Sequence, residues 1–297
     1  MNIIHLSCAA PPQIGGIGKV ANEIVKRLRG RGEDAVLFAP RLKHDLGEPD
    51  PAWVTRRPAF IRWGNAAALG GINASLKKAD VVHLHYPFFG TAEKVAEYCL
   101  WHRKPLVMTF HMDATAPFPL GFVFDTYRVV AQPAVLRTCK KIFVSSFDYA
   151  DVSSVRGFKE AHPDRFVELP FGVDQSFYTG NGHGATGMGE MRSRFGIPQN
   201  VRVIGFVGAM DHAHRFKGVF ELLEAAKDMP NVHLLLVGDG DRRRVYEARA
   251  KELGMLERCH FTGRLVDDDL ADAYRGMDVF AFPSTSGAEA FGLVAAE

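Results

Sequence analysis

Short apolar runs rich in β-branched residues recur along the chain, and longer stretches with helical periodicity separate them. Runs of this length predict buried strands, and strands that alternate with helices predict parallel sheets built from right-handed crossovers. The pattern therefore predicts an α/β protein. The expected strands are residues 2–6, 34–39, 80–85, 105–110, 141–146, 165–169, 201–208, 232–238, 259–263 and 278–282.

The alternation breaks once, at the segment TGNGHGATGMGE over residues 179–190. Glycine and small polar residues without a period are typical of a flexible connection between domains. We therefore expect two Rossmann-like domains, over residues 1–180 and 181–297. The second supplies only the last four expected strands, and its last helix has no room to finish. We expect this domain to be incomplete.

The composition is that of an ordinary globular protein, with 47% hydrophobic and 24% charged residues. No stretch reaches the roughly 18 uncharged apolar residues of a spanning helix, and the N-terminus has no basic region, so we expect a cytoplasmic protein. The net charge of +2 argues against nucleic-acid binding. The four cysteines are too scattered to favour disulfides or a zinc site. They are Cys8, Cys99, Cys139 and Cys259.

Glycines open an amphipathic helix in IGGIGKVANEIVKRL, residues 14–28. Backbone N–H groups at Gly15, Gly16 and Gly18, together with the positive end of the helix, favour a phosphate. Gly16, Gly18 and Ala21 also fit the dinucleotide pattern G-x-G-x-x-A, so an NADP-linked oxidoreductase is an alternative. Against it, SCAAPPQI separates the glycines from the first strand, and the second strand ends without an acidic residue. A purely structural turn is the third interpretation.

Histidines and aspartates offer weaker signals. His83 and His85 alternate along one strand and His111 ends the next, and with His212 and His214 they suggest a metal cluster. Histidines at the carboxyl ends of parallel strands also line ligand clefts without a metal, and we favour this interpretation. The acidic runs at 239–241 and 267–269 fall where helices are expected to begin, so capping and dipole compensation explain them.

The second half holds an ordered set of segments: GFVGAMDHAHRFKGVFELLEA, LLLVGDG, HFTGRL, DVFAFPS and EAFGLVAAE. Together they resemble the C-terminal domain of retaining family-4 glycosyltransferases of the GT-B fold (glycosyl transferases group 1). The segments GGIG, TFH and ELPFGVD extend the resemblance to the first half. It implies two Rossmann-like domains that face each other across the active site. Members of this family usually continue beyond EAFGLVAAE, so the chain looks C-terminally truncated.

The resemblance also implies roles for individual residues. Glu289 would accept hydrogen bonds from the hydroxyls of the donor sugar, and Lys217 would neutralise the diphosphate. Many members carry an arginine where this chain has Ala209, and Arg215 is the candidate to replace it. The acceptor side would hold His111 with Asp113. The remaining implied contacts are Glu297 to the ribose, Arg264 and Leu265 to the base, Gly16 to the donor phosphate, and the amides around Ala290, Phe291 and Gly292 to the diphosphate.

The spacing of Glu289 and Glu297 is compatible with this interpretation. If both lay on one helix, about 12 Å would separate them along its axis. A glycosidase carboxylate pair needs only about 5 to 9.5 Å across one bond. We therefore expect the two glutamates to hold two places on one extended ligand.

The reaction implied is metal-independent transfer of a hexose, with retained configuration, from a UDP- or GDP-sugar such as UDP-glucose or GDP-mannose to a sugar or lipid-linked acceptor. The leaving phosphate would help deprotonate the acceptor, and no cofactor is needed beyond the nucleotide sugar. A nucleotide-sugar-binding fragment with little turnover is an alternative. A truncated domain leaves a sheet edge uncovered, so we also expect weak activity and self-association.

Aromatic and basic residues are interleaved over residues 53–78. This mixture suits the interface of an anionic membrane, so a lipid-linked acceptor and peripheral membrane association are expected. A solvated surface with a few core aromatics is the alternative. The residues concerned are Trp53, Arg56, Arg57, Phe60, Arg62, Trp63, Lys77 and Lys78.

Overall fold

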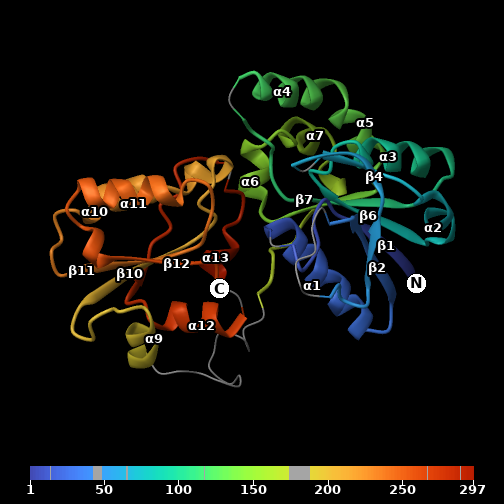
Figure 1. Ribbon diagram of the computed structural model, residues 1–297. Helices are drawn as coiled ribbons and strands as arrows, with labels where there is room; N and C mark the ends of the chain where they lie inside the picture. The colour runs from blue at the N-terminus through green and yellow to red at the C-terminus, as the bar shows by residue number, and fades with distance from the viewer. Residues whose placement is uncertain are drawn as a thin grey trace. The chain divides into compact units, whose positions relative to one another are not determined.

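The computed structural model describes residues 1–13, 15–42, 49–64, 66–116, 118–173, 188–265, 267–287 and 289–297. The chain divides into two compact units, Met1–Phe171 and Gly172–Glu297 (Figure 1). The expected domain boundary at residues 180 and 181 lies outside the described residues. Each unit is built around its own parallel sheet. Every predicted strand region contains a strand, so the α/β prediction is confirmed.

The first unit has a seven-stranded sheet in the order β3-β2-β1-β6-β7-β8-β9, in which all neighbours are parallel. The order places β1 in the interior, with connections that run outward on both sides, as in other doubly wound sheets. The strands are β1 (Asn2–Leu6), β2 (Asp34–Pro40), β3 (Val54–Arg57), β6 (Val81–Tyr86), β7 (Leu106–Phe110), β8 (Lys141–Val144) and β9 (Phe166–Glu168).

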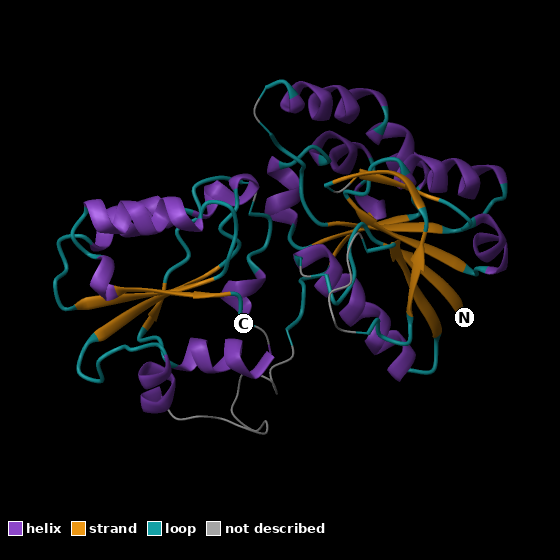
Figure 2. Ribbon diagram, in the orientation of Figure 1, coloured by secondary structure: helices purple, strands orange, loops and turns teal. Residues whose placement is uncertain are grey.

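Helices cover both faces of this sheet (Figure 2). Helix α1 (Gly16–Gly30) buries Ala21 and Val25 against β1 and β2, as its periodicity predicts. The other helices are α2 (Asn73–Lys78), α3 (Thr91–Trp101), α4 (Leu120–Val130), α5 (Gln132–Thr138), α6 (Phe147–Val152), α7 (Arg156–Ala161) and the 3₁₀ turn η1 (Pro163–Arg165).

The two faces of this sheet differ in chemistry. Successive side chains of a strand point to opposite faces, and the register of β1, β6 and β7 aligns like with like. One face carries apolar side chains at the centre of the sheet, such as Leu6, Leu84 and Met108. The other carries a polar row in the same three strands. Its members are His5, His83, His85 and Thr109, all buried.

Three strands were not predicted from the sequence: β3 and a short antiparallel pair, β4 (Ala59–Trp63) and β5 (Ala66–Leu69). These strands fall inside the segment that we interpreted as a basic and aromatic surface. Arginine, tryptophan and alanine make up much of both strands of the hairpin, and such residues give no alternating apolar pattern.

The second unit has a four-stranded parallel sheet in the order β12-β11-β10-β13. Its strands are β10 (Arg202–Val207), β11 (Val232–Val237), β12 (Cys259–Gly263) and β13 (Val279–Phe280). The helical elements are α9 (Met188–Arg194), η2 (His212–Lys217), α10 (Val219–Ala226), α11 (Arg243–Glu252), η3 (Leu256–Arg258), α12 (Asp267–Arg275) and α13 (Leu293–Ala296).

Two apolar cores hold this sheet between its helices. Phe206, Leu234 and Leu236 face α10 and α11, while Val203 and Leu235 face α9 and α12. Because both faces are covered, the strands read as nearly continuous hydrophobic runs, which is why they were predicted correctly. Within the described part of the chain, no helix has the length and hydrophobicity needed to cross a bilayer.

Candidate functional site

Glycines end three neighbouring strands of the second unit. Gly208 donates its N–H to Val237 at 3.0 Å, and Gly238 donates to Gly263 at 2.9 Å. A Cβ at Gly238, where φ is +141°, would lie 1.8 Å from the carbonyl oxygen of Gly208. Gly208, Gly238 and Gly263 therefore form a surface without side chains, here called the glycine floor. It lies at the carboxyl edge of the sheet, where open α/β sheets bind ligands. We did not predict this row from the sequence.

Lys217 ends η2 beside this floor, and its position is fixed by the next residue. Gly218 has φ of +78°, and a Cβ there would lie 2.0 Å from the carbonyl oxygen of Pro283. The N–H of Thr285 also donates to the carbonyl of Phe216 at 2.8 Å. The loop after β10 is therefore held against the loop after β13.

This contact brings together Lys217 and Glu289, which are 72 residues apart in the sequence. The Lys217 Nζ atom lies 2.5 Å from Glu289 Oε2, and only 14% and 16% of the two side chains are exposed. Ser284 Oγ donates to the same carboxylate oxygen at 3.4 Å. A Cβ at Gly208 would lie 2.9 Å from Lys217 Cδ, so the lysine stem crosses the glycine floor.

Arg215 lies on the same turn as Lys217 and is exposed. Ala209 is half-buried at the end of the glycine floor.

The helical interpretation of residues 289–297 is wrong for Glu289. Only Leu293–Ala296 is helical, and Gly292, with φ of +71°, precedes it as the N-cap. Glu289, Ala290 and Phe291 lie before the helix, so the separation of about 12 Å along a common axis does not apply. A Cβ at Gly292 would lie 2.5 Å from the Phe282 ring, which explains the glycine there.

Glu297 contacts a residue that the sequence analysis missed. The hydroxyl of Tyr274, on α12, lies 3.1 Å from Glu297 Oε2 and 3.2 Å from the carbonyl oxygen of Val294. The two glutamates therefore have different partners, Lys217 from η2 and Tyr274 from α12. A tyrosine in an amphipathic helix reads as a core residue, so the sequence carries no signal for this contact.

Arg264 and Leu265 follow directly after Gly263, at the carboxyl end of β12. Arg264 is exposed, whereas Leu265 packs against the core shared with α12. Both residues are thus at the glycine-lined edge of the sheet.

The acidic runs have local structural roles. Asp241 accepts a hydrogen bond from the N–H of His212 at 2.8 Å, so it supports η2 and not helix α11, which begins at Arg243. This corrects the capping interpretation for that run. Asp269, in the first turn of α12, pairs with Arg194 at 2.5 Å. A surface hollow next to the first run is lined by Asp239, Gly240, Asp241, Arg243, Arg244 and Glu247.

In the first unit, Gly16 is the first residue of α1 and Gly15 precedes it. A Cβ at Gly18 would lie 3.1 Å from the backbone of Ala9, so Gly18 permits the close packing of α1 against the chain that follows β1. A Cβ at Gly15 would meet no atom within 4 Å. Packing therefore explains Gly18 and leaves the backbone at Gly15 and Gly16 approachable.

His111 follows β7 and is buried. Its Nε2 atom lies 3.0 Å from His85 Nδ1, and burial lowers its pKa to about 3. Asp113 is held elsewhere, because its carboxylate accepts hydrogen bonds from the Ser154 hydroxyl at 2.5 Å and the Ser154 N–H at 2.9 Å. The Asp113 carboxylate is thus bonded to Ser154, whereas His111 is bonded to His85.

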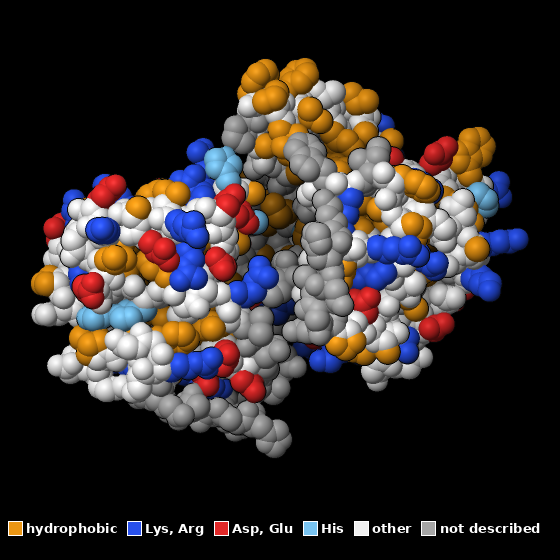
Figure 3. Space-filling model, in the orientation of Figure 1, with side chains coloured by type: hydrophobic (Ala, Val, Ile, Leu, Met, Phe, Trp, Pro, Cys, Tyr) orange, Lys and Arg blue, Asp and Glu red, His pale blue; other side chains and the backbone are white. Residues whose placement is uncertain are grey.

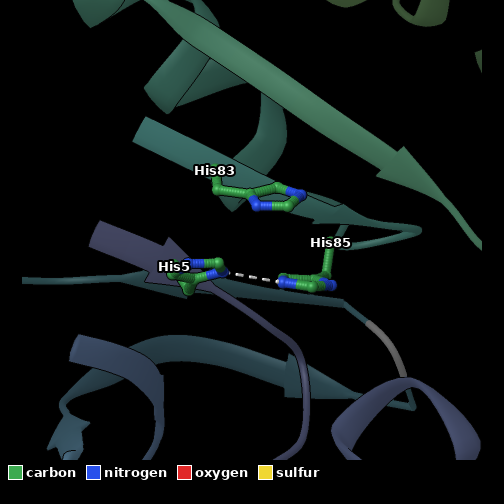
Figure 4. Close-up of side chains that lie close together, drawn as sticks. All are labelled: His5, His83 and His85. Atoms are coloured by element: carbon green, nitrogen blue, oxygen red, sulfur yellow. Dashed lines mark hydrogen bonds between the residues drawn. The ribbon is translucent and has the colours of Figure 1, made fainter. Parts of the chain in front are cut away.

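His5, His83 and His85 lie close together, as Figure 4 shows, with one ring nitrogen of each within 4.8 Å of the others. A metal ion must lie in the plane of each imidazole that binds it. The rings of His83 and His85, however, are stacked with centroids 4.6 Å apart and planes at 16°, so an ion between them would not lie in both ring planes. We therefore interpret this group as hydrogen-bonded rather than metal-binding. His83 and His85 were candidates from the sequence, whereas His5 was not.

The basic residues of the 53–78 segment largely serve the fold. Arg56 contacts Asp50 at 2.8 Å and the carbonyls of Ala10 and Pro11, and its side chain is only 11% exposed. Arg57 donates to Ser75 and lies over the Phe38 ring. Lys77, Lys78 and Phe60 remain exposed. The guanidinium groups of Arg56 and Arg57 are thus directed into the unit and not toward a membrane.

Two family models match the chain in sequence order. The model of glycosyltransferase family 4 matches residues 14–177, and the model of glycosyl transferases group 1 matches residues 188–297.

Curated relatives match over most of the chain. D-inositol 3-phosphate glycosyltransferase of Corynebacterium efficiens is 30% identical over 258 residues, which cover 78% of this chain and 56% of the relative. Phosphatidyl-myo-inositol mannosyltransferase of Mycobacterium leprae is 26% identical over 298 residues, covering 95% and 72%. The chain therefore spans only part of the length of these relatives.

A solved structure shows the fold. The crystal structure of Anabaena Alr3699/HepE in complex with UDP matches 96% of this chain and 75% of its own, with a TM-score of 0.68 and 19% identity.

Proposed function

Because the chain belongs to glycosyltransferase family 4 and has the GT-B fold with two Rossmann-like domains, we propose that it transfers a hexose from a nucleoside-diphosphate sugar to an acceptor. The observation that carries this proposal is the pair Lys217 and Glu289 at the glycine-lined edge of the second sheet. The lysine cation suits a diphosphate and the carboxylate suits sugar hydroxyls, and a nucleoside-diphosphate sugar carries these two parts next to each other.

Lys217 acts on the leaving group. Negative charge grows on the diphosphate as the glycosidic bond breaks, and a fixed ammonium group in a partly buried site stabilises that charge more than water does. The lysine stem is held across Gly208, so the ammonium needs little reorganisation. Glu289 accepts hydrogen bonds from hydroxyls of the transferred sugar and orients its reacting carbon.

Other residues at this edge hold the nucleotide. Glu297, supported by Tyr274, accepts from the ribose hydroxyls, and Arg264 with Leu265 contacts the base. The amides of Ala290, Phe291 and Gly292 face the diphosphate. We propose that the first domain, residues 1–180, holds the acceptor and that residues 181–297 hold the donor.

We propose transfer with retained configuration and without a metal or other cofactor. The acceptor attacks from the face that the diphosphate leaves, and a phosphate oxygen takes the acceptor proton. His111 is a poor alternative base, since burial lowers its pKa to about 3 and a general base works best near the operating pH.

Helix α4 favours a lipid-linked acceptor over a soluble sugar. Its inner side packs through Phe124 and Tyr127 against Phe89. The opposite side carries apolar residues that are between 56% and 88% exposed, and Figure 3 shows hydrophobic side chains gathered over this helix. An exposed apolar helix face suits the acyl boundary of a membrane. Its residues, with Phe118 just before the helix, are Phe122, Val123, Val129 and Val130.

Vesicle sedimentation tests this part. We expect replacement of Phe122 and Val130 by serine to lower the bound fraction on lipid vesicles. The matched control exchanges the exposed Leu100 and Trp101, at the end of α3, for serine. Equal binding of both variants would remove the support for a lipid acceptor while leaving sugar transfer in place.

Titration with UDP, GDP and NADPH, followed by a donor-hydrolysis screen, tests the function as a whole. We expect binding of one nucleoside diphosphate and slow hydrolysis of its sugar conjugate. Nucleotide binding without transfer or hydrolysis would favour the binding fragment. Tight NADPH binding would overturn the proposal in favour of the oxidoreductase.

A further inference from the structure

Three buried histidines form a continuous hydrogen-bonded chain in the first unit. His5 Nδ1 lies 3.1 Å from His85 Nε2, and His85 Nδ1 lies 3.0 Å from His111 Nε2. The rings come from β1, from β6 and from the end of β7, on one face of the sheet. Figure 4 shows the inner two rings joined edge to edge. The proposed donor contacts use neither His5 nor His85.

All three rings are neutral at ordinary pH. Burial holds the pKa of His5 and of His85 well below the usual range, and it lowers that of His111 to about 3. A neutral imidazole has one N–H and one bare nitrogen. Each hydrogen bond in the chain therefore uses one proton, supplied by one of its two rings.

Proton counting leaves two arrangements that keep both hydrogen bonds. If His85 carries its proton on Nδ1, it donates to His111 Nε2, so His111 is protonated on Nδ1 and His5 donates from its own Nδ1. If His85 carries its proton on Nε2, it donates to His5 Nδ1, and His111 donates from its own Nε2 to His85 Nδ1. His111 Nδ1 is then bare, and His5 carries its proton on Nε2.

The His5 end of the hydrogen-bonded histidine chain decides between these two arrangements. His5 Nε2 is buried and has no hydrogen-bond partner among the described residues. A buried N–H without any partner is rarer in folded proteins than a buried acceptor that lacks one. The arrangement with a bare His5 Nε2 is therefore favoured.

We propose that His5 and His85 are positioning residues that hold His111 in the tautomer with its proton on Nδ1. His111 Nε2 is directed into the domain, so Nδ1 is the ring nitrogen that remains for a substrate. In this tautomer it donates a hydrogen bond to a substrate oxygen and does not accept a proton.

This inference rests on the proposed function only for the identity of that oxygen, a hydroxyl of the transferred sugar or of the acceptor. A donor at this position holds the hydroxyl without competing for its proton. The proton of the attacking hydroxyl then goes to the leaving phosphate.

Nitrogen-15 NMR of histidine side chains in the full chain measures the tautomer directly. We expect His111 Nδ1 to have the chemical shift of a protonated ring nitrogen and Nε2 that of a bare one. In water the opposite tautomer is the commoner, so the expected result differs from that of an unconstrained ring. Loss of the signals in His111→Gln assigns them. A bare or averaged Nδ1 in the unsubstituted protein would overturn the proposal.

Two substitutions at His5 test whether the inner end sets the tautomer. His5→Ala leaves a polar space beside His85 Nε2 that a water molecule can fill, and water accepts or donates equally well. We expect the His111 shifts to move toward an average of the two tautomers. His5→Phe fills the space and keeps it dry, so the shifts should stay as in the unsubstituted protein. Unchanged shifts in His5→Ala would show that the inner end does not act on His111.

The second unit provides a matched control. His233 Nδ1 lies 2.9 Å from His260 Nε2. His260→Phe therefore removes a histidine hydrogen bond of similar length that does not belong to the series His5, His85 and His111. We expect it to leave the His111 shifts unchanged. The NMR measurement needs no substrate. The expected tautomer without sugar transfer from any donor would refute the proposed function alone, and transfer with the opposite tautomer would refute this inference alone.

Discussion

Two clusters of polar side chains, one in each unit, are stabilised in opposite ways. Lys217 and Glu289 meet as opposite charges in a partly exposed position, and each is stabilised by the other. His5, His83, His85 and His111 of the first unit are more deeply buried, lie among one another and are neutral. Burial without an opposite charge favours the neutral form, whereas a nearby partner favours the charged one.

The two clusters are therefore suited to different functions. The charged pair is suited to a ligand that carries charge, such as a diphosphate, and to the step in which that charge grows. The neutral chain cannot supply charge, but it fixes the direction of hydrogen bonds. Substitutions at the two groups should therefore affect different measurements.

The largest effect is expected at the charged pair. Lys217→Ala removes the cation that stabilises the leaving diphosphate, and we expect the transfer rate to fall by about 10²- to 10³-fold. Arg215→Ala, on the same turn but with an exposed side chain, should weaken transfer less. Initial rates of hexose transfer measure both. Near-wild-type rates for both variants would contradict the assignment of this site.

The next effect tests how the loop after β10 holds Lys217 in place. Gly218→Ala forces a left-handed backbone on alanine and places its Cβ against Pro283. We expect a loss of about 1 to 3 kcal/mol in stability from the strain, together with weaker nucleotide binding because the two loops separate. Thermal unfolding by circular dichroism and nucleotide titration measure these changes.

Gly254→Ala is the matched control for this effect. Its φ is +68°, but a Cβ there would meet no atom within 4 Å. It should lose stability through the backbone alone and keep its nucleotide affinity. Equal affinities in the two variants would show that Pro283 is not needed to place Lys217.

The sequence predicted the sheets far better than the contacts within the sites. Buried parallel strands are short apolar runs, and such runs are visible without any partner. Lys217 and Glu289 could be named from the family resemblance, but their contact depends on Gly218 packing under Pro283. His5 looked like a lone histidine in a strand, since only the pairing of β1 with β6 places it beside His83 and His85.

Acid should destabilise the first unit. His83 and His111 stay neutral in the folded state down to a pKa of about 4 and about 3, whereas an unfolded histidine takes a proton near pH 6.5. As pH falls from 6.5, the unfolded state binds more protons, so stability falls. Each group contributes about 1.4 kcal/mol per pH unit until its folded pKa is reached.

Tryptophan fluorescence reports this loss for the first unit, because Trp53, Trp63 and Trp101 all lie there. The urea concentration at the midpoint of unfolding should decrease as the pH is lowered from 7 to 5. His83→Phe should reduce the slope, while His102→Gln, at an exposed histidine, should not. A flat profile for the unsubstituted protein would mean that the buried histidines titrate normally.

The smallest effect is expected at Tyr274, where a neutral group supports a charged one. Tyr274→Phe removes the hydroxyl beside Glu297 and leaves the ring in place. A lost hydrogen bond costs about 0.5 to 1.5 kcal/mol, so we expect the nucleotide Kd to rise by about 2- to 10-fold. Tyr98→Phe, which removes an exposed hydroxyl from the first unit, is the control and should leave Kd unchanged. If Tyr274→Phe instead bound the nucleotide more tightly, the tyrosine would compete with the ribose for Glu297 and not orient it.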